Sequence, residues 1–264
     1  MQQAKELLKK LRAAYEKKED DLGLKLLAQL KLLLLEFSAL PPATPAAPTA
    51  PQREELEIAR EVLEYGALLS IRTVDIPSFE RHVAQLKIYY TDCASTLEES
   101  PRQYPLLGLN LLRLLAQNRI AEFHTELETL PTDLQTTNDY IKFPAQLEQN
   151  IMEGSYNRVL SAKQSGLYAQ EGMYFMDMLV DMVREEIAEC SEKAYDNIVA
   201  GDLQTLLMLS SSADLNEYAA QRKWSVSAGD VRFGKGDAET LFELPARKLI
   251  SETLAYAKEL ERIV

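Results

Sequence analysis

The 264-residue chain has few of the residues on which metal, redox and nucleophilic chemistry depend. It contains two histidines, His82 and His124, and two cysteines, Cys93 and Cys190, all distant from one another in sequence. A zinc site needs about three or four converging ligands, and a catalytic cysteine needs a neighbouring histidine and a depressed pKa. Neither pattern is present. We therefore expect these four residues to be structural or surface groups, the thiols to be reduced, and the chain to be no enzyme and to use no metal or cofactor.

Phosphate-binding and membrane-spanning patterns are also missing. No glycine-rich loop ends in Gly-Lys-Ser or Gly-Lys-Thr, and Gly234-Lys-Gly is more typical of a flexible linker. The longest apolar run, Leu32–Leu35, is far too short to cross a bilayer, and no apolar signal region follows Met1. These absences favour a soluble protein of the cytoplasm and nucleus.

Basic residues are scarce relative to acidic ones. The chain has 29 Lys and Arg against 41 Asp and Glu, a net charge of −12. Binding to nucleic acid depends on neutralising phosphates, and adsorption to an anionic membrane depends on positive charge. We therefore expect neither nucleic acid nor a membrane among the partners.

The scarcity of glycine and proline, 10 and 11 residues, favours helix over sheet. The clearest helix follows Asp75, a suitable N-cap, and places Phe79, Val83, Leu86 and Tyr90 on one face. Helices are predicted at about 4–15, 22–37, 53–70, 76–90, 106–115, 120–130, 144–152 and 156–163. Loops are predicted at 41–52, which is rich in proline, at 95–105, where Pro101 and Pro105 oppose helix, and at 132–138.

Two of the predicted helical hairpins resemble each other. Gly66 precedes Phe79, and Gly108 precedes Phe123, with the two phenylalanines 44 residues apart. A glycine inside a helix costs about 1 kcal/mol relative to alanine, so close approach of the partner helix is the simplest reason for it. The spacing predicts a right-handed, TPR-like or HEAT-like array of helical hairpins over residues 1–165.

The pattern changes in residues 166–236. A long helix is predicted at 173–199, followed by shorter ones at 202–209 and 215–223, the latter capped by Ser211. Two short β runs, 224–228 and 231–233, then flank Gly229-Asp230 and predict a β-hairpin. Three helices followed by a hairpin is the order of a winged helix. Residues 237–264 are predicted to form a linker and a C-terminal helix.

The predicted C-terminal helix has an apolar stripe that continues to the last residue. At 100° per residue its members lie within an arc of about 140°. They are Leu249, Ile250, Leu254, Ala257, Leu260 and Val264. Either this helix folds back on its own domain, or it enters a helical bundle supplied by partners; we favour the bundle.

The predicted wing offers a second surface. Val226, Val231 and Phe233 are candidates for a strand edge that pairs with a partner. For Trp224 and Phe233 we favour the alternative that they seal the core of the small domain. The candidate recognition helix carries only Arg222 and Lys223 near its end, which is poorly suited to reading DNA.

Helical repeats that lead into a winged helix follow the plan of the PCI domain. Three stretches, 75–87, 106–128 and 147–158, resemble the 26S proteasome non-ATPase regulatory subunit 8 family, PCI-domain subunits of the proteasome lid. The resemblance covers most of the chain from about Glu54 to Lys223, and the end of the chain is similar too.

This resemblance implies a non-catalytic, structural role in ubiquitin-dependent protein degradation. It implies that winged helices of lid subunits join edge to edge, that C-terminal helices gather into a shared bundle, and that the subunit promotes docking of the lid on the base of the regulatory particle. A scaffold of the COP9 signalosome or of translation initiation factor 3, and an enzyme with an unrecognised site, remain as alternatives.

Overall fold

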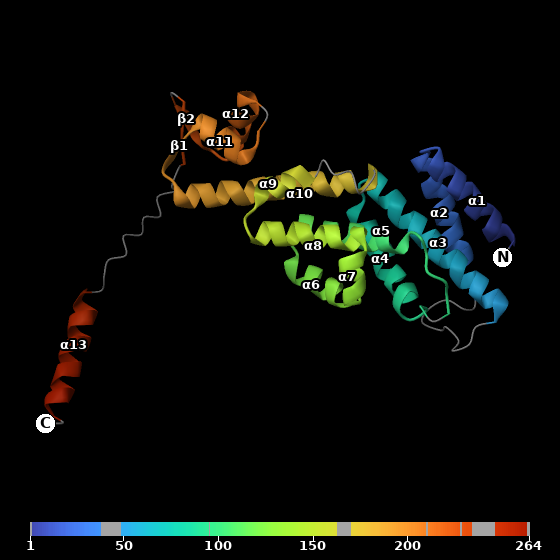
Figure 1. Ribbon diagram of the computed structural model, residues 1–264, viewed down its shortest axis with the longest axis horizontal. Coiled ribbons are helices and arrows are strands. Elements are labelled where there is room, and N and C mark those ends of the chain that lie inside the picture. The colour runs from blue at the N-terminus through green and yellow to red at the C-terminus, as the bar shows by residue number, and fades with distance from the viewer. Residues whose placement is uncertain are drawn as a thin grey trace. The chain divides into compact units, whose positions relative to one another are not determined.

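Helices make up nearly all of the regular structure (Figure 1). The computed structural model describes residues 2–37, 49–94, 96–162, 170–209, 211–227, 229–233 and 246–262. These residues form thirteen helices and three short strands, which confirms the prediction of a mainly α fold. The chain divides into two compact units, Met1–Val183 and Arg184–Val264, and the division falls within helix α10 (Gln170–Ala194). The domain boundary predicted at 165/166 lies outside the described residues.

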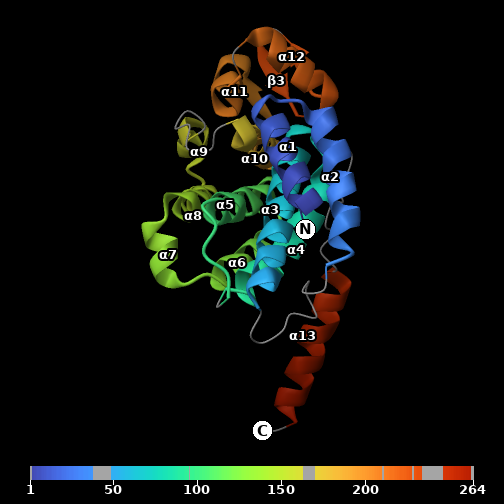
Figure 2. The same ribbon diagram turned by 90° about the vertical axis from the view of Figure 1, so that its right-hand side faces the viewer.

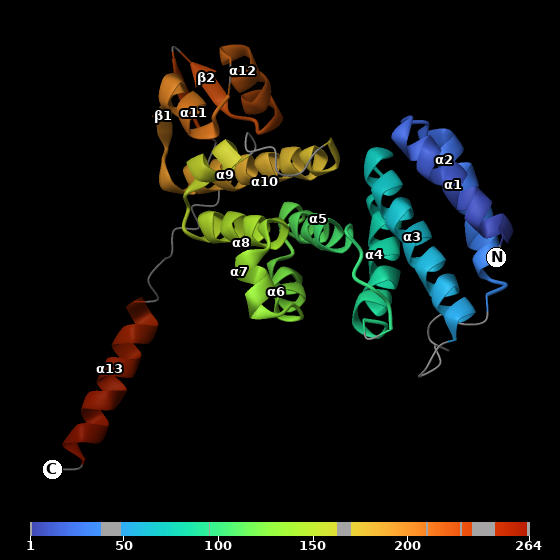
Figure 3. The ribbon, with the colours of Figure 1, turned by 45° about the vertical axis from the view of Figure 1, so that its right-hand side comes forward.

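Unit 1 is built from helical hairpins. Its helices are α1 (Gln2–Glu16), α2 (Asp20–Leu34), α3 (Ala50–Arg72), α4 (Ile76–Thr91), α5 (Gln103–Ala116), α6 (Ile120–Glu128), α7 (Thr132–Thr137), α8 (Asp139–Met152) and α9 (Tyr156–Ala162). Helix α3 packs along α4 and also contacts α1, α2 and α5, while α5 packs against α6 and α8 (Figure 3). Figure 2 shows α1 and α2 side by side. The predicted hairpins are therefore present.

The α3–α4 hairpin has the features expected of it. The Asp75 carboxylate accepts a hydrogen bond from the Ser78 N–H (3.1 Å) and so caps α4. Phe79 is fully buried and packs against Phe175, with ring centroids 5.6 Å apart. A Cβ placed on Gly66 would lie 3.1 Å from both Nε2 of His82, in α4, and a methyl carbon of Leu27, in α2. Close approach of the neighbouring helices explains this glycine, as predicted.

His82 forms a buried polar chain that joins α2, α3 and α4. The Ser70 hydroxyl donates to the Gly66 carbonyl (2.7 Å) and lies 3.2 Å from Nδ1 of His82. Lys31 Nζ lies 2.7 Å from Nε2 and can only donate. This network assigns the proton of a neutral imidazole to Nδ1. Burial has the largest effect on the pKa of His82 and, together with the nearby charges of Lys31 and Arg81, lowers it to about 4.

Three prolines that were expected in loops or at the start of a helix lie inside helices. Pro51 and Pro105 occupy first turns, where backbone N–H groups have no intrahelical partner, so the missing donor costs little. Pro144 lies within α8, because the Asn138 side chain caps the helix six residues earlier by accepting from the Tyr140 N–H (3.0 Å). Most of the proline-rich stretch, residues 38–48, lies outside the described part of the chain. Thr49 is described and immediately precedes α3.

The loop predicted at 132–138 is also wrong, because Thr132–Thr137 form the short helix α7. The Gln135 side chain donates to the carbonyls of Leu127 (2.8 Å) and Leu130 (3.0 Å). These bonds satisfy carbonyl groups at and after the end of α6 and hold α7 against it.

Unit 2 has the element order of a winged helix. After the end of α10 come β1 (Asn197–Val199), α11 (Ala200–Leu207), α12 (Ser212–Gln221), β2 (Ser225–Ser227), β3 (Asp230–Arg232) and α13 (Ala246–Glu261). The three strands form an antiparallel sheet in the order β1-β3-β2. Ser211 and Asp214 form the capping box that opens α12, with both hydrogen bonds 3.2 Å long.

The long helix predicted at 173–199 is wrong at its C-terminal end. Helix α10 stops at Ala194, and the next residues form β1. The Phe233 N–H donates to the Asp196 carbonyl (3.2 Å), and the Ala200 N–H donates to the Gly229 carbonyl (2.8 Å). Residues 197–199 form a strand because they pair with β3, and the β-branched Ile198 and Val199 favour this conformation.

We predict that Gly66→Ala lowers the free energy of unfolding by about 1–3 kcal/mol, since the added methyl group must displace His82 or Leu27. Gly201→Ala is the matched control, because nothing lies within 4 Å of a Cβ at that helical position. It should be neutral or slightly stabilising. Chemical denaturation of both variants measures the difference, and equal effects would contradict the close approach at Gly66.

We predict that His82 makes stability depend on pH. The folded state lowers its pKa from the ordinary 6.5 to about 4, so the unfolded chain binds the proton more strongly. The contribution of neutral His82 to the free energy of unfolding is present above about pH 6.5 and is lost as the pH falls. The loss is about 2 kcal/mol at pH 5. Urea denaturation should show that the free energy of unfolding falls less between pH 8 and pH 5 in His82→Gln than in the parent chain. His124→Gln should behave like the parent, and a pH dependence unchanged in His82→Gln would refute this assignment.

Candidate interaction surfaces

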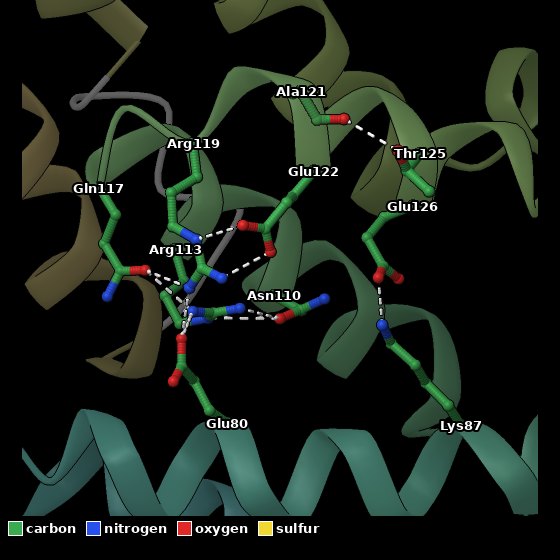
Figure 4. A network of polar contacts seen from close by, with 10 residues as sticks. All are labelled: Glu80, Lys87, Asn110, Arg113, Gln117, Arg119, Ala121, Glu122, Thr125 and Glu126. Carbon is green, nitrogen blue, oxygen red and sulfur yellow. Dashed lines mark hydrogen bonds and ion pairs between the residues drawn. The ribbon is translucent and has the colours of Figure 1, made fainter.

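A polar network around the buried Arg113 joins α4, α5 and α6 (Figure 4). The Arg113 guanidinium, almost completely buried, contacts the Glu80 carboxylate and donates to Asn110 Oδ1 at 3.0 and 3.3 Å. Arg119 donates to the same Glu80 oxygen (2.8 Å) and makes two bonds to Glu122, of 2.8 and 2.6 Å. Burial lowers the pKa of Arg113, and the two carboxylates oppose this shift. The carboxylates of this network are occupied by arginines, so it fixes the helices and offers no free catalytic group.

A cavity of about 730 Å³ lies between α1, α3 and residues 98–102. It is lined by Glu64, whose side chain is fully buried and accepts a hydrogen bond from the Tyr90 hydroxyl (3.1 Å). Arg60 and Arg102 lie 3.8 and 3.9 Å from the Glu64 carboxylate, and Arg102 also stacks on the Tyr65 ring at 4.2 Å. Burial raises the pKa of Glu64, although the neighbouring donors and cations lower it. The Glu64 carboxylate thus has its partners within the protein, and its contacts link α3, α4 and residues 98–102.

The histidines and cysteines are not brought together into a site. Within the described residues no group of three or more His, Cys, Asp or Glu side chains could hold a metal ion. Cys93 is buried, and burial raises the pKa of its thiol, which disfavours the thiolate. His124 is half exposed and pairs with Glu148 (3.3 Å). Cys93 therefore lacks the surroundings of a nucleophile, and Cys190 is an exposed free thiol.

No helix in the described ranges is both long and apolar enough to span a bilayer. This finding concerns those helices alone.

The core of the winged helix is aromatic. Trp224 packs edge to face against Phe233 and Tyr218, with ring centroids 5.0 and 5.7 Å apart. Its indole N–H donates to Glu192 (2.7 Å), and Arg222 lies 3.6 Å from the same carboxylate oxygen. Trp224 and Phe233 therefore seal this core, as favoured from the sequence, and Arg222 of the candidate recognition helix is engaged within the unit.

Among the described residues, no further strand pairs with either edge of the sheet. On β3 the backbone groups of residues 229, 231 and 233 face β1, as the bonds from Ala200 and to Asp196 show. Because backbone groups alternate in direction along a strand, residues 230 and 232 face β2, and Val226 of β2 turns its own N–H and C=O outward. On the opposite edge, Asn197 and Val199 of β1 also turn their N–H and C=O groups outward.

Of the residues predicted at the wing edge, Val226 lies on an edge strand, whereas Val231 and Phe233 do not, and the contact of Val226 with a partner stays a prediction. Val226 lies on an edge strand and is 44% exposed, whereas Val231 lies on the central strand and is fully buried. Phe233 is buried among the aromatic residues. The β1 edge was not predicted, because residues 197–199 were expected to continue a helix; the adjacent β-branched Ile198 and Val199 were the available signal for a strand.

Helix α13 exposes its apolar stripe throughout. None of its residues is buried, and Ile250 and Leu254 are 58% and 65% exposed. Leu249, Ala257 and Leu260 are exposed as well, while Val264 lies outside the described residues. Tyr256, 69% exposed, extends the stripe and was missed, although it lies seven residues after Leu249 and four before Leu260.

The chain is similar to known proteins over nearly its full length. A model of the CSN8/PSMD8/EIF3K family matches residues 101–240. The 26S proteasome non-ATPase regulatory subunit 8 homolog A of Arabidopsis thaliana is 46% identical, over 97% of this chain and 95% of that protein. The 26S proteasome regulatory subunit rpn12 of Schizosaccharomyces pombe is 36% identical, over 95% and 96% of the two chains. The subunit RPN12 of Saccharomyces cerevisiae is 32% identical, over 98% of each.

These matches agree with the winged helix and with the helical hairpins that precede it. They also agree with the resemblance of residues 75–87, 106–128 and 147–158 noted from the sequence. The chain belongs to the CSN8/PSMD8/EIF3K family and, within it, to the 26S proteasome non-ATPase regulatory subunit 8 proteins.

Proposed function

We infer that the chain is a non-catalytic, structural subunit of the lid of the 26S proteasome regulatory particle. It supports lid assembly and docking of the lid onto the base, and so acts in ubiquitin-dependent protein degradation in the cytoplasm and nucleus. The names of its relatives support the assignment to the regulatory particle. The observation that carries the structural role is the exposed apolar stripe of α13.

An amphipathic helix with no buried residue needs a partner to cover its apolar side. Leu249, Ile250, Leu254, Tyr256 and Leu260 are all between 47% and 69% exposed. Burying five large side chains contributes on the order of 8–15 kcal/mol before the costs of ordering and association are subtracted. A bundle formed with C-terminal helices of other lid subunits supplies the required apolar surface.

The free edges of the winged-helix sheet supply a second contact. A strand from a neighbouring subunit can pair with the outward N–H and C=O of Val226, or with those of Asn197 and Val199. Strand addition at these edges accounts for side-by-side assembly of subunits of this kind and requires no catalytic group.

A scaffold of the COP9 signalosome or of translation initiation factor 3 is the alternative within the same family, whose description includes CSN8 and EIF3K. The full-length similarity to proteasome subunits favours the proteasome. Affinity purification of the tagged chain in gentle salt separates the two, because the co-purifying subunits identify the complex.

We predict that Ile250→Glu/Leu254→Glu lowers incorporation into the lid at least tenfold. Each buried side chain of this size contributes about 1.5–3 kcal/mol, and about 1.4 kcal/mol corresponds to a factor of ten. The control is Ser251→Glu/Ala255→Glu, which adds the same charges at the same spacing on the other side of α13. Native mass spectrometry of the reconstituted lid measures incorporation. Equal incorporation of both double variants would exclude a role for the apolar stripe.

We predict that Val226→Pro weakens contact with a neighbouring subunit and leaves the isolated chain nearly as stable as the parent. Proline is tolerated on an edge strand where the N–H faces outward, but it removes the donor that a partner strand would use. Ser225→Pro is the control, since its backbone faces β3 and the substitution should lower the melting temperature. Thermal denaturation and lid reconstitution distinguish the outcomes. Full incorporation of Val226→Pro would mean that the β2 edge is not paired in the complex.

A further inference from the structure

Lys31 is a cation with an unusual partner. Its side chain reaches from α2 to His82 of α4, where Nζ lies 2.7 Å from Nε2 of the neutral imidazole. Among the described residues no carboxylate forms an ion pair with this ammonium group, and the neighbouring charge that acts on it is that of Arg81, which is also positive. A lysine in such a place holds its proton less firmly than one in water, because no counter-ion compensates for the lost solvent.

These surroundings make the amino group of Lys31 a nucleophile. Partial burial has the largest effect and, together with the charge of Arg81, lowers the pKa of Lys31 from its ordinary 10.5. A larger fraction of the group is therefore the neutral amine, which is the nucleophilic form. Lysines activated in enzymes are likewise desolvated or lie next to another cation. The residue as a whole is nevertheless exposed, so an electrophile in solution can approach it.

His82 is oriented to accept a proton from this amine. The Ser70 hydroxyl donates to the Gly66 carbonyl and therefore accepts from Nδ1 of His82 (3.2 Å), which leaves the lone pair of Nε2 facing Lys31. A neutral amine can donate one N–H to Nε2 and still keep its own lone pair for attack. The charge of Lys31 contributes to the low pKa of His82, so the imidazole becomes more basic once the amine is neutral.

We propose that Lys31 is a site of N-acylation by acyl thioesters, with His82 as the base that takes up the proton. The neutral Nζ attacks the carbonyl carbon of the thioester, a C–N bond forms, and the C–S bond breaks as the thiolate leaves with the electron pair. The proton lost by Nζ passes to Nε2 of His82 and then through solvent to the thiolate, so the products are an amide and a thiol. The amide N–H can still donate to Nε2, so acylation removes the charge and keeps the link between α2 and α4.

The test follows acetylation of the folded full-length chain by acetyl-coenzyme A at pH 8, with quantitative mass spectrometry of each lysine over time. Lys25 is the internal comparison, because it is exposed on the same helix and makes no described contact with a histidine. We expect Lys31 to react at least about fivefold faster than Lys25. His82→Gln keeps a hydrogen-bond acceptor but removes the base, so it should lower the rate at Lys31 at least about fivefold and leave Lys25 unchanged.

A second variant tests the same site without changing a buried residue. Arg81 is exposed, and Arg81→Ala removes the neighbouring positive charge, which should raise the pKa of Lys31 and lower its rate about twofold. Equal rates at Lys31 and Lys25 in the parent chain would overturn the proposal. So would an unchanged rate at Lys31 in a His82→Gln variant that retains the circular dichroism of the parent or, if that variant does not fold, in Arg81→Ala. The inference goes beyond the proposed function and does not depend on it, because the reaction involves side chains of this chain alone.

Discussion

Unit 1 depends on the close packing of α3 against its neighbours. Helix α3 is in contact with α1, α2, α4 and α5, so its position determines how the first five helices are arranged. At Gly66 the surfaces of α2 and α4 come so near that an added methyl group would lie 3.1 Å from both Leu27 and His82, so that one of them would have to shift. His82 in turn links the three helices through Ser70 and Lys31. A glycine and a neutral histidine thus define one register in which all of these helices fit, because interiors packed at this density tolerate little change in volume.

The same packing leaves apolar surface that one chain does not bury. Helix α2 covers one face against α1 and α3 and presents another, and α13 presents its stripe along its whole described length. In a chain that works alone such surfaces would promote aggregation. The function proposed above would remove these surfaces from water through contact with neighbouring subunits. Among the polar groups of unit 1, Arg113, Arg119 and Glu64 have partners inside the unit and link its helices and loops to one another.

The sequence predicted features that local chemistry decides. Asp75 and Ser211 were recognised as caps because their side chains satisfy N–H groups of the next turn, whatever the tertiary context. Asn118 adopts a positive φ of 55° at the turn predicted between α5 and α6, as short polar residues readily do. The apolar positions of α13, apart from Tyr256, also followed from periodicity.

Features decided by distant contacts could not be predicted in this way. Residues 197–199 are a strand because β3 lies beside them, and the two β-branched residues Ile198 and Val199 are too short a run to decide it alone. The order β1-β3-β2 follows from this pairing, and it moves Val231 from a presumed edge to the buried centre. Pro144 was taken for a helix start, because the cap at Asn138 prevails over the preference of proline for a first turn.

The position of the single tryptophan gives the two units separate optical signatures. Trp224 is 7% exposed, hydrogen-bonded to Glu192 and enclosed by aromatic rings, and all of its described partners belong to unit 2. Its fluorescence emission therefore reports on the winged helix and is insensitive to events confined to the helical hairpins. Far-ultraviolet dichroism is dominated instead by the many helices of unit 1. Comparison of the two signals during denaturation reveals whether the hairpin array and the winged helix melt as one cooperative block or in separate steps.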